Sequence, residues 1–223
     1  MADFKKMTLA LATAGLLSSG AGQAALNDRG GGLIFDDVLN ITWLSDANYA
    51  MSSGHDSDGR MTFGAANTWA ANLLYHDSVR NVDYTDWRLP TALNQNGTGP
   101  CVGFNCTSSE MGHMFYNNLG ATAGNSILSG SNAINLALFT NLQSYVYWSG
   151  TVYAPSPALN AWYFGTDIGD QNVTSQYLEF YAWAVRPGDV AAVPEPETYA
   201  MLLAGLGLLG MVAKRRRRSF DAS

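Results

Sequence analysis

The central part of the chain is short of positive charge. Residues 26–193 of the 223-residue sequence contain no lysine and five arginines, against fourteen aspartates and glutamates, which leaves a net charge of −9. Proteins that bind nucleic acid rely on clustered lysine and arginine to neutralise phosphates. The acidic body therefore argues against nucleic acid as a partner.

Motifs of common catalytic sites are also lacking. The sequence has three histidines and contains neither a Gly-x-Ser-x-Gly nor a His-Glu-x-x-His pattern, so neither a hydrolase nor a metalloprotease is supported. No phosphate-binding glycine loop is present, and the glycine run at residues 30–32 is expected to be a flexible mature N-terminus. The sequence therefore predicts a protein that is not an enzyme and needs no cofactor.

Cysteine is scarce as well, with only Cys101 and Cys106 in the chain. In an exported protein such a pair favours a disulfide, which would close a small loop ahead of a predicted helix. The alternatives are a redox-active pair or a thiol metal site, although no further soft ligands lie at zinc-like spacing.

The N-terminus is typical of a secretory signal. Lys5 and Lys6 precede an apolar stretch over residues 7–17, and small residues at 22–24 offer a cleavage site. Residues 1–24 are therefore predicted to be a signal peptide, recognised by the Sec machinery and cut after Ala24. The alternative interpretation is an alanine-rich core helix.

The C-terminus contains a second apolar stretch. Residues 199–213 carry no charge and are followed by one lysine and four arginines at 214–218. As a helix the stretch would reach about 22 Å, against a hydrocarbon core of ~30 Å, so it predicts a short, marginal transmembrane helix. The cations would stay in the cytoplasm and the body would lie outside.

The whole C-terminal segment, VPEPETYAMLLAGLGLLGMVAKRRRR at residues 193–218, resembles a PEP-CTERM sorting signal. The resemblance implies processing by an exosortase, a membrane cysteine protease or transpeptidase, near Pro194, Glu195 and Pro196. It also implies a Gram-negative bacterium that makes exopolysaccharide. The protein would be held in the inner membrane transiently and then released to the cell surface or extracellular matrix. The alternative is a plain single-span anchor.

The body, residues 26–190, is predicted to be an α+β domain. Phe35, Ile41 and Trp43 favour strands, and aspartate and asparagine at 36–40 favour a turn, so residues 32–44 should form two strands. Further strands are expected over residues 145–151, 161–165 and 176–186.

Two helices are expected between these strands. Thr62 is a predicted N-cap for a helix over residues 63–75, whose buried face would contain Phe63, Ala66, Ala70, Leu73 and Leu74. Thr107 and Glu110 have the spacing of a capping box for the second helix. Its buried face would contain Met111, Met114, Phe115 and Leu119, with Gly120 as the stop.

Four patches of the body resemble the Lcl C-terminal domain family: DWRLPT at 86–91, YWSGT at 147–151, AWYF at 161–164 and WAVRP at 183–187. The resemblance extends upstream through residues 59–63. It implies a compact C-type-lectin-like fold and a place in surface adhesins or other exported bacterial proteins. The chain departs from the family pattern at Gly150, where members often have serine.

The patches supply a set of structural residues: Trp87, Arg88, Leu89, Pro90, Trp148, Trp162 and Arg186. Trp87 and Leu89 should point inward, so Arg88 should point the other way. Arg88 and Arg186 are rare cations in an acidic body and should form ion pairs with carboxylates. The alternative is capture of a ligand carboxylate.

Asp56 and Asp58 stand two residues apart before Gly59, a spacing that calcium loops use. A third oxygen ligand and a late glutamate are missing, which favours a solvated turn over a calcium site. Calcium is thus the one metal that the sequence suggests, and only weakly.

We expect an exported, non-enzymatic module for adhesion or polysaccharide binding, with exopolysaccharide or a surface protein as partner. The alternatives are a cysteine-dependent oxidative enzyme of the formylglycine-generating type and a passive structural matrix protein. In the binding hypothesis, exposed tyrosines would stack on sugar rings, from the set Tyr145, Tyr147, Tyr153, Tyr163, Tyr177 and Tyr181.

Overall fold

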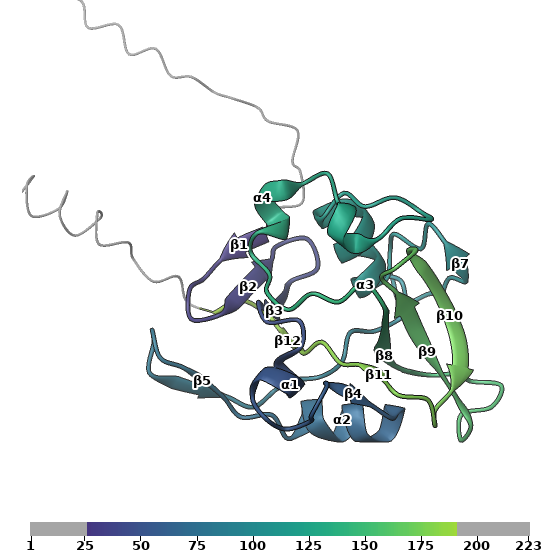
Figure 1. Cartoon of the computed structure of the whole chain (residues 1–223), viewed down its shortest axis with the longest axis horizontal. Coiled ribbons are helices and arrows are strands. Elements are labelled where there is room, and N and C mark those ends of the chain that lie inside the picture. Colours follow the sequence, from purple (N-terminus) through teal and green to yellow (C-terminus); the bar gives the residue numbers. More distant parts are fainter. Residues whose placement is uncertain (1–25, 191–223) are drawn as a thin grey trace, which may run out of the picture.

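The computed structural model describes residues 26–190, which form an α+β domain (Figure 1). The predicted signal peptide at 1–24, the Pro-Glu-Pro box at 194–196 and the predicted span at 199–213 lie outside the described residues. Within residues 26–190, no helix is long and apolar enough to cross a membrane.

The first sheet holds both ends of the described chain. Its strands are β1 (Leu26–Asp28), β2 (Leu33–Asp36), β3 (Ile41–Leu44) and β12 (Val185–Pro187), in the order β1-β2-β3-β12 and all antiparallel. The predicted turn at 36–40 is confirmed. Asp36 accepts the N–H groups of Val38 and Leu39, and Asn40 has a φ of 52°, which asparagine tolerates.

Residues 30–32 form a tight turn between β1 and β2 rather than a loose end. All three glycines have φ between 63° and 77°, a region that other residues rarely adopt. The two chain ends are also joined directly, since Arg29 donates two hydrogen bonds to Asp189 at 2.9 and 2.6 Å.

The second sheet has six strands in the order β4-β11-β8-β9-β10-β7. They are β4 (Arg60–Met61), β7 (Gly103–Phe104), β8 (Val146–Val152), β9 (Asn160–Gly165), β10 (Asp170–Ser175) and β11 (Phe180–Tyr181). The predicted single strand at 176–186 is wrong. It splits into β11 and β12 because the chain leaves one sheet and joins the other, burying Trp183 at the crossing.

Four α-helices are present in the described residues, where two were expected: α1 (Tyr49–Ser52), α2 (Phe63–Ala71), α3 (Glu110–Gly112) and α4 (Ala133–Leu136). A π-helical stretch, His113–Asn118, continues α3, and a 3₁₀ turn covers Ile127–Ser129. A small hairpin pairs β5 (Tyr75–Asp77) with β6 (Val82–Tyr84).

Helix α2 is confirmed, with the Thr62 hydroxyl accepting the Ala65 N–H, but it ends before the predicted boundary. The chain turns into β5 after Asn72, so Leu74 is 60% exposed instead of buried. Trp69, which the prediction left out, takes a place on the buried face of the helix.

Helix α3 has the predicted buried face, and Gly120 ends the turn with a φ of 66°. The predicted capping box is wrong. Ser109 caps the helix by accepting the Gly112 N–H at 3.2 Å. Glu110 does not reach back to the cap, because its carboxylate is engaged by Arg88.

The core consists of two clusters of buried side chains. One lies around Trp69, Trp87 and Trp148 and includes the inner face of α2. The other lies around Trp43 and Trp183 and includes the buried face of α3. These indoles use their apolar bulk to fill the core, and Trp148 and Trp183 also donate to backbone carbonyls at 2.8 and 2.7 Å.

Candidate functional site

A buried ion pair joins the DWRLPT segment to α3. Both terminal nitrogens of Arg88 donate to the Glu110 carboxylate at 2.7 Å, and the Thr91 N–H donates to the same carboxylate at 2.8 Å. Glu110 is 8% exposed, so its charge depends on these donors. The expected ion pair is thus present, and Glu110 occupies the place that a ligand carboxylate would take at Arg88.

The patches that suggested the family meet around this pair. The backbone of Arg88 exchanges two hydrogen bonds with Val185, and the Gly150 N–H donates to the Pro90 carbonyl at 2.7 Å. Arg186 donates to Asp86 at 2.8 and 3.0 Å. The aromatic and aliphatic members are buried in the core: Trp87, Leu89, Trp148 and Trp162.

Gly150 lies where β8 approaches this segment. A Cβ atom built there would lie 3.2 Å from the Leu89 Cβ and 3.3 Å from its carbonyl oxygen. Glycine therefore avoids a tight contact. A serine at this position would push β8 and the segment at Leu89 apart by a few tenths of an ångström.

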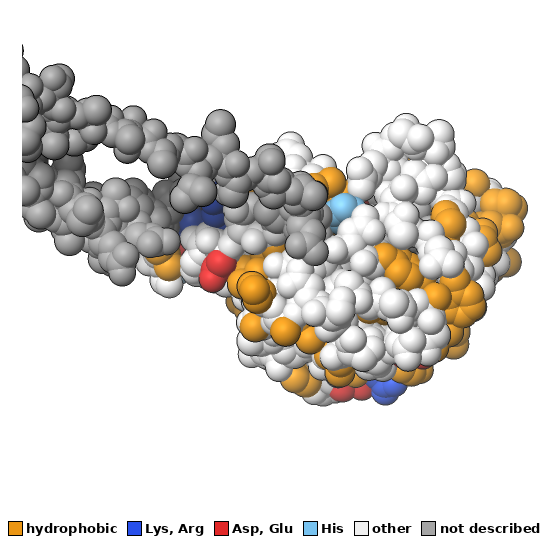
Figure 2. Space-filling model, turned by 90° about the horizontal axis from the view of Figure 1, so that it is seen from above, with side chains coloured by type: hydrophobic (Ala, Val, Ile, Leu, Met, Phe, Trp, Pro, Cys, Tyr) orange, Lys and Arg blue, Asp and Glu red, His pale blue; other side chains and the backbone are white. Residues whose placement is uncertain are grey.

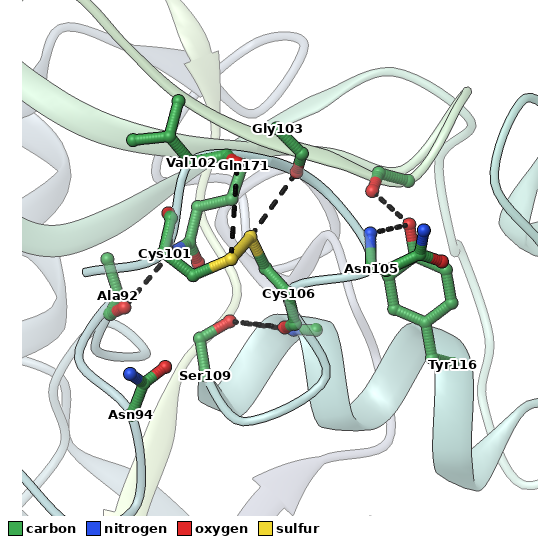
Figure 3. Close-up of a disulfide and its surroundings, with 12 residues drawn as sticks. Ala92, Asn94, Cys101, Val102, Gly103, Asn105, Cys106, Ser109, Tyr116 and Gln171 are labelled. Carbon is green, nitrogen blue, oxygen red and sulfur yellow. Dashed lines mark hydrogen bonds between the residues drawn. A yellow bond between two sulfur atoms is a disulfide. The ribbon is translucent and has the colours of Figure 1, made fainter. Parts of the chain in front are cut away.

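The predicted disulfide between Cys101 and Cys106 is confirmed (Figure 3). Its loop is tied to the six-stranded sheet by Gln171, whose amide nitrogen donates to the carbonyls of Ala92 and Cys101 at 3.0 and 2.8 Å. Tyr116 accepts the Asn105 N–H at 2.9 Å and donates to the Gly169 carbonyl. The disulfide loop is therefore fixed on both sides.

The loop also lies directly on α3. A Cβ atom at Gly112 would come within 1.8 Å of the Cys106 carbonyl oxygen, so only glycine allows this approach. Cys106 is 1% exposed, and no free cysteine is found in residues 26–190. This is the environment of a structural disulfide.

Asp56 and Asp58 form a turn closed by their own backbone. Asp56 accepts the N–H groups of Asp58 and Gly59, while Asp58 accepts both the N–H and the side chain of Arg60. Hydrogen bonds from the backbone and side chain of Arg60 lower the pKa of Asp58. Within residues 26–190, no cluster of three or more potential ligands could hold a metal ion.

A buried polar cluster was not anticipated from the sequence. His113 is 3% exposed, and its Nδ1 lies 2.8 Å from the amide nitrogen of Asn117. This contact assigns the ring proton to Nε2, which lies 3.9 Å from the Asp36 carboxylate. Asp36 itself accepts the Asn118 amide at 2.7 Å. Burial lowers the pKa of His113, although Asp36 opposes that shift.

The six tyrosines proposed for ring stacking separate into two groups. Tyr145 and Tyr177 are 43% and 74% exposed, whereas Tyr147 is completely buried and accepts the Gln143 N–H. Burial strongly raises the pKa of Tyr147. Tyr153, Tyr163 and Tyr181 are partly buried, so two of the six are exposed and Tyr177 alone among them has more than half of its surface in solvent.

Several hollows open on the surface of residues 26–190. One of about 470 Å³ lies beside α1 and α2. A second of about 390 Å³ borders Thr91 and Glu110, and a third of about 170 Å³ lies between Arg88 and Gly150. We call the first the α1–α2 groove; its lining is Tyr49, Ser53, His55, Gly64, Ala65, Thr68, Trp69, Asn72, Leu73 and Leu74.

The groove was not predicted from the sequence, because the prediction for α2 concerned only its buried face. The signal was nevertheless present on the opposite face, where Gly64, Thr68 and Asn72 recur every four residues. Small and polar side chains at that spacing leave a shallow strip along a helix.

These features define a disulfide-containing α+β domain in which the segment at 86–91 is joined to both sheets by backbone hydrogen bonds and to α3 by an ion pair. The Lcl C-terminal domain family matches residues 32–186, more than half of the chain, and the chain belongs to this family. The PEP-CTERM protein-sorting motif matches residues 192–218 and supports an exported protein that an exosortase processes. No curated protein and no solved structure matches the chain.

Replacing Arg88 with alanine should destabilise the domain by about 1–2 kcal/mol. Breaking a fully buried ion pair costs about 3–5 kcal/mol, and the loss here is smaller because the Arg88 side chain is 40% exposed. Chemical denaturation measures the change. Arg60→Ala removes an exposed arginine–aspartate pair and is the matched control; an equal loss in both variants would contradict the importance of Glu110.

Acidification should destabilise the protein through His113. The folded protein holds His113 with a pKa below the usual 6.5, so the unfolded chain takes up a proton first as the pH falls. The free energy of unfolding should therefore decrease below about pH 6.5, with at most about 1.4 kcal/mol per pH unit from this residue.

The slope of unfolding free energy against pH tests this, measured between pH 5 and 7. His113→Asn should flatten the slope, whatever stability it loses at neutral pH. A slope that His113→Asn does not alter would count against the buried neutral imidazole.

Removing the disulfide with Cys101→Ala and Cys106→Ala together should lower stability by about 2 kcal/mol, since the closed loop is short. Denaturation under oxidising conditions gives the value.

Thiol titration of the native exported protein should find no reactive thiol; a titratable pair would contradict a structural disulfide.

Proposed function

We propose that this protein is a non-enzymatic adhesion module that binds polysaccharide outside the cell. The observation that carries the proposal is the order of the two matched regions: the sorting motif at 192–218 directly follows the domain at 32–186. The domain is thus the part of the chain that export delivers. We also propose that its α+β fold is C-type-lectin-like, which the family resemblance supports.

The chemistry of the surface favours binding without catalysis. Figure 2 shows a face with scattered hydrophobic side chains and few charged ones. Tyr177 is 74% exposed and Tyr145 is 43% exposed, so both can stack on sugar rings. The processed protein would act at the cell surface or in the matrix of a Gram-negative bacterium, after a transient stay in the inner membrane.

Two other functions make different demands on the chain. A cysteine-dependent oxidative enzyme would need Cys101 and Cys106 as reactive thiols. The thiol titration above would support this enzyme if it found reactive thiols, and would rule it out if it found none. A passive matrix component would alter matrix cohesion on deletion while every binding assay stayed silent.

Exopolysaccharide from the producing cells should retain the processed protein recovered from the culture medium. Immobilised polysaccharide measures retention, with and without added calcium. Tyr177→Ala should weaken retention several-fold, because an exposed ring loses its stacking contact, and Tyr153→Ala at a partly buried position serves as the comparison. No retention at any calcium concentration would overturn the proposal.

A further inference from the structure

The α1–α2 groove combines an apolar wall with a row of polar groups. Leu73 is partly buried and Leu74 is 60% exposed, while Trp69 reaches the floor of the groove with only 4% of its surface exposed. Ser53, His55, Thr68 and Asn72 supply hydroxyl, imidazole and amide groups. Sites for small polar ligands have this composition, and the volume of about 470 Å³ lies in their usual range of ~300–1,000 Å³.

The polar groups keep hydrogen-bonding capacity for a ligand. The Thr68 hydroxyl and the Asn72 amide nitrogen donate to backbone carbonyls of α2 at 2.8 and 3.0 Å, which leaves the oxygen of each side chain as an acceptor. His55 is exposed, and among residues 26–190 its ring makes an aromatic contact with Trp69 and no hydrogen bond.

Charge excludes an anionic ligand from the groove. None of its ten lining residues is Asp, Glu, Lys or Arg. Elsewhere in residues 26–190, each of the five arginines is already paired with a carboxylate. An anionic sugar would therefore meet a body of net charge −9 and find no unpaired arginine.

We propose that the α1–α2 groove binds a neutral sugar unit of a polysaccharide chain. One face of the ring would lie on Leu73 and the exposed Leu74, and its hydroxyl groups would bond to the polar row on α2. Tyr177 is not part of the lining, but it follows Gln176, whose carbonyl accepts the Phe63 N–H at the beginning of α2. The inference rests on the proposed polysaccharide-binding function and gives that function a site and a ligand class.

The groove lies apart from the family patches, although Trp69 in its floor belongs to the core. Its lining contains none of the family patches. Exposed positions in the lining can therefore be substituted to test binding. Gly64 and Ala65 are exposed on α2, and no atom lies within 4 Å of a Cβ built at Gly64. A large side chain placed there fills the groove without entering the core.

Affinity electrophoresis of the processed protein in dextran, mannan and alginate gels tests the inference. Ala65→Trp should weaken binding to a neutral polysaccharide at least tenfold. Ala71→Trp places the same side chain on the same helix, at an exposed position outside the groove, and should leave binding unchanged. Thr68→Val combined with Asn72→Ala should also weaken it, and the two tryptophan variants should keep the thermal midpoint of the parent.

Different failures have different meanings. If Ala65→Trp and Ala71→Trp bind as the parent does, the groove assignment is wrong while the proposed function stands. Preference for alginate over dextran and mannan overturns the neutral-sugar ligand. If the parent protein is retained by no polysaccharide, including the native exopolysaccharide, the proposed function fails and this inference fails with it.

Discussion

The ion pair between Arg88 and Glu110 is the contact on which the arrangement of this domain depends. It fixes the segment at 86–92 to the start of α3, and the same segment pairs with β12 and accepts the Gly150 N–H from β8. Each sheet therefore reaches the segment through its backbone, and the third helix reaches it through a carboxylate. An isolated glutamate at 8% exposure would be costly, so the pair must form when the parts assemble.

This role explains why the family patches do not coincide with the proposed ligand site. Residues 86–91, 147–151 and 183–187 come together because they hold the two sheets, and their large side chains are in the core. The α1–α2 groove has none of these residues in its lining. A family of this kind can keep its scaffold while the lining of such a groove varies, because surface substitutions there cost little stability.

Local chemistry predicted local features well. The β2–β3 hairpin, the Thr62 cap and the buried face of α3 follow from residues a few positions apart. Long-range partners changed the rest: Arg88 draws Glu110 away from the cap, and the two sheets divide the expected strand at 176–186. The spacing of Gly64, Thr68 and Asn72 indicates the α2 side of the groove, but the side formed by α1 depends on tertiary packing that no local spacing predicts.

The distribution of charge limits which polymers the exported domain can bind. All five arginines of the domain are paired with carboxylates, which leaves an excess of acidic groups at the surface. An acidic matrix polymer would therefore be repelled by the domain at low salt. Contact with a polymer must then rest on uncharged surface. Aromatic rings and hydroxyl or amide groups provide such contact without counter-ions, and the α1–α2 groove is lined by both. The same reasoning predicts that salt should affect its binding to neutral sugars very little.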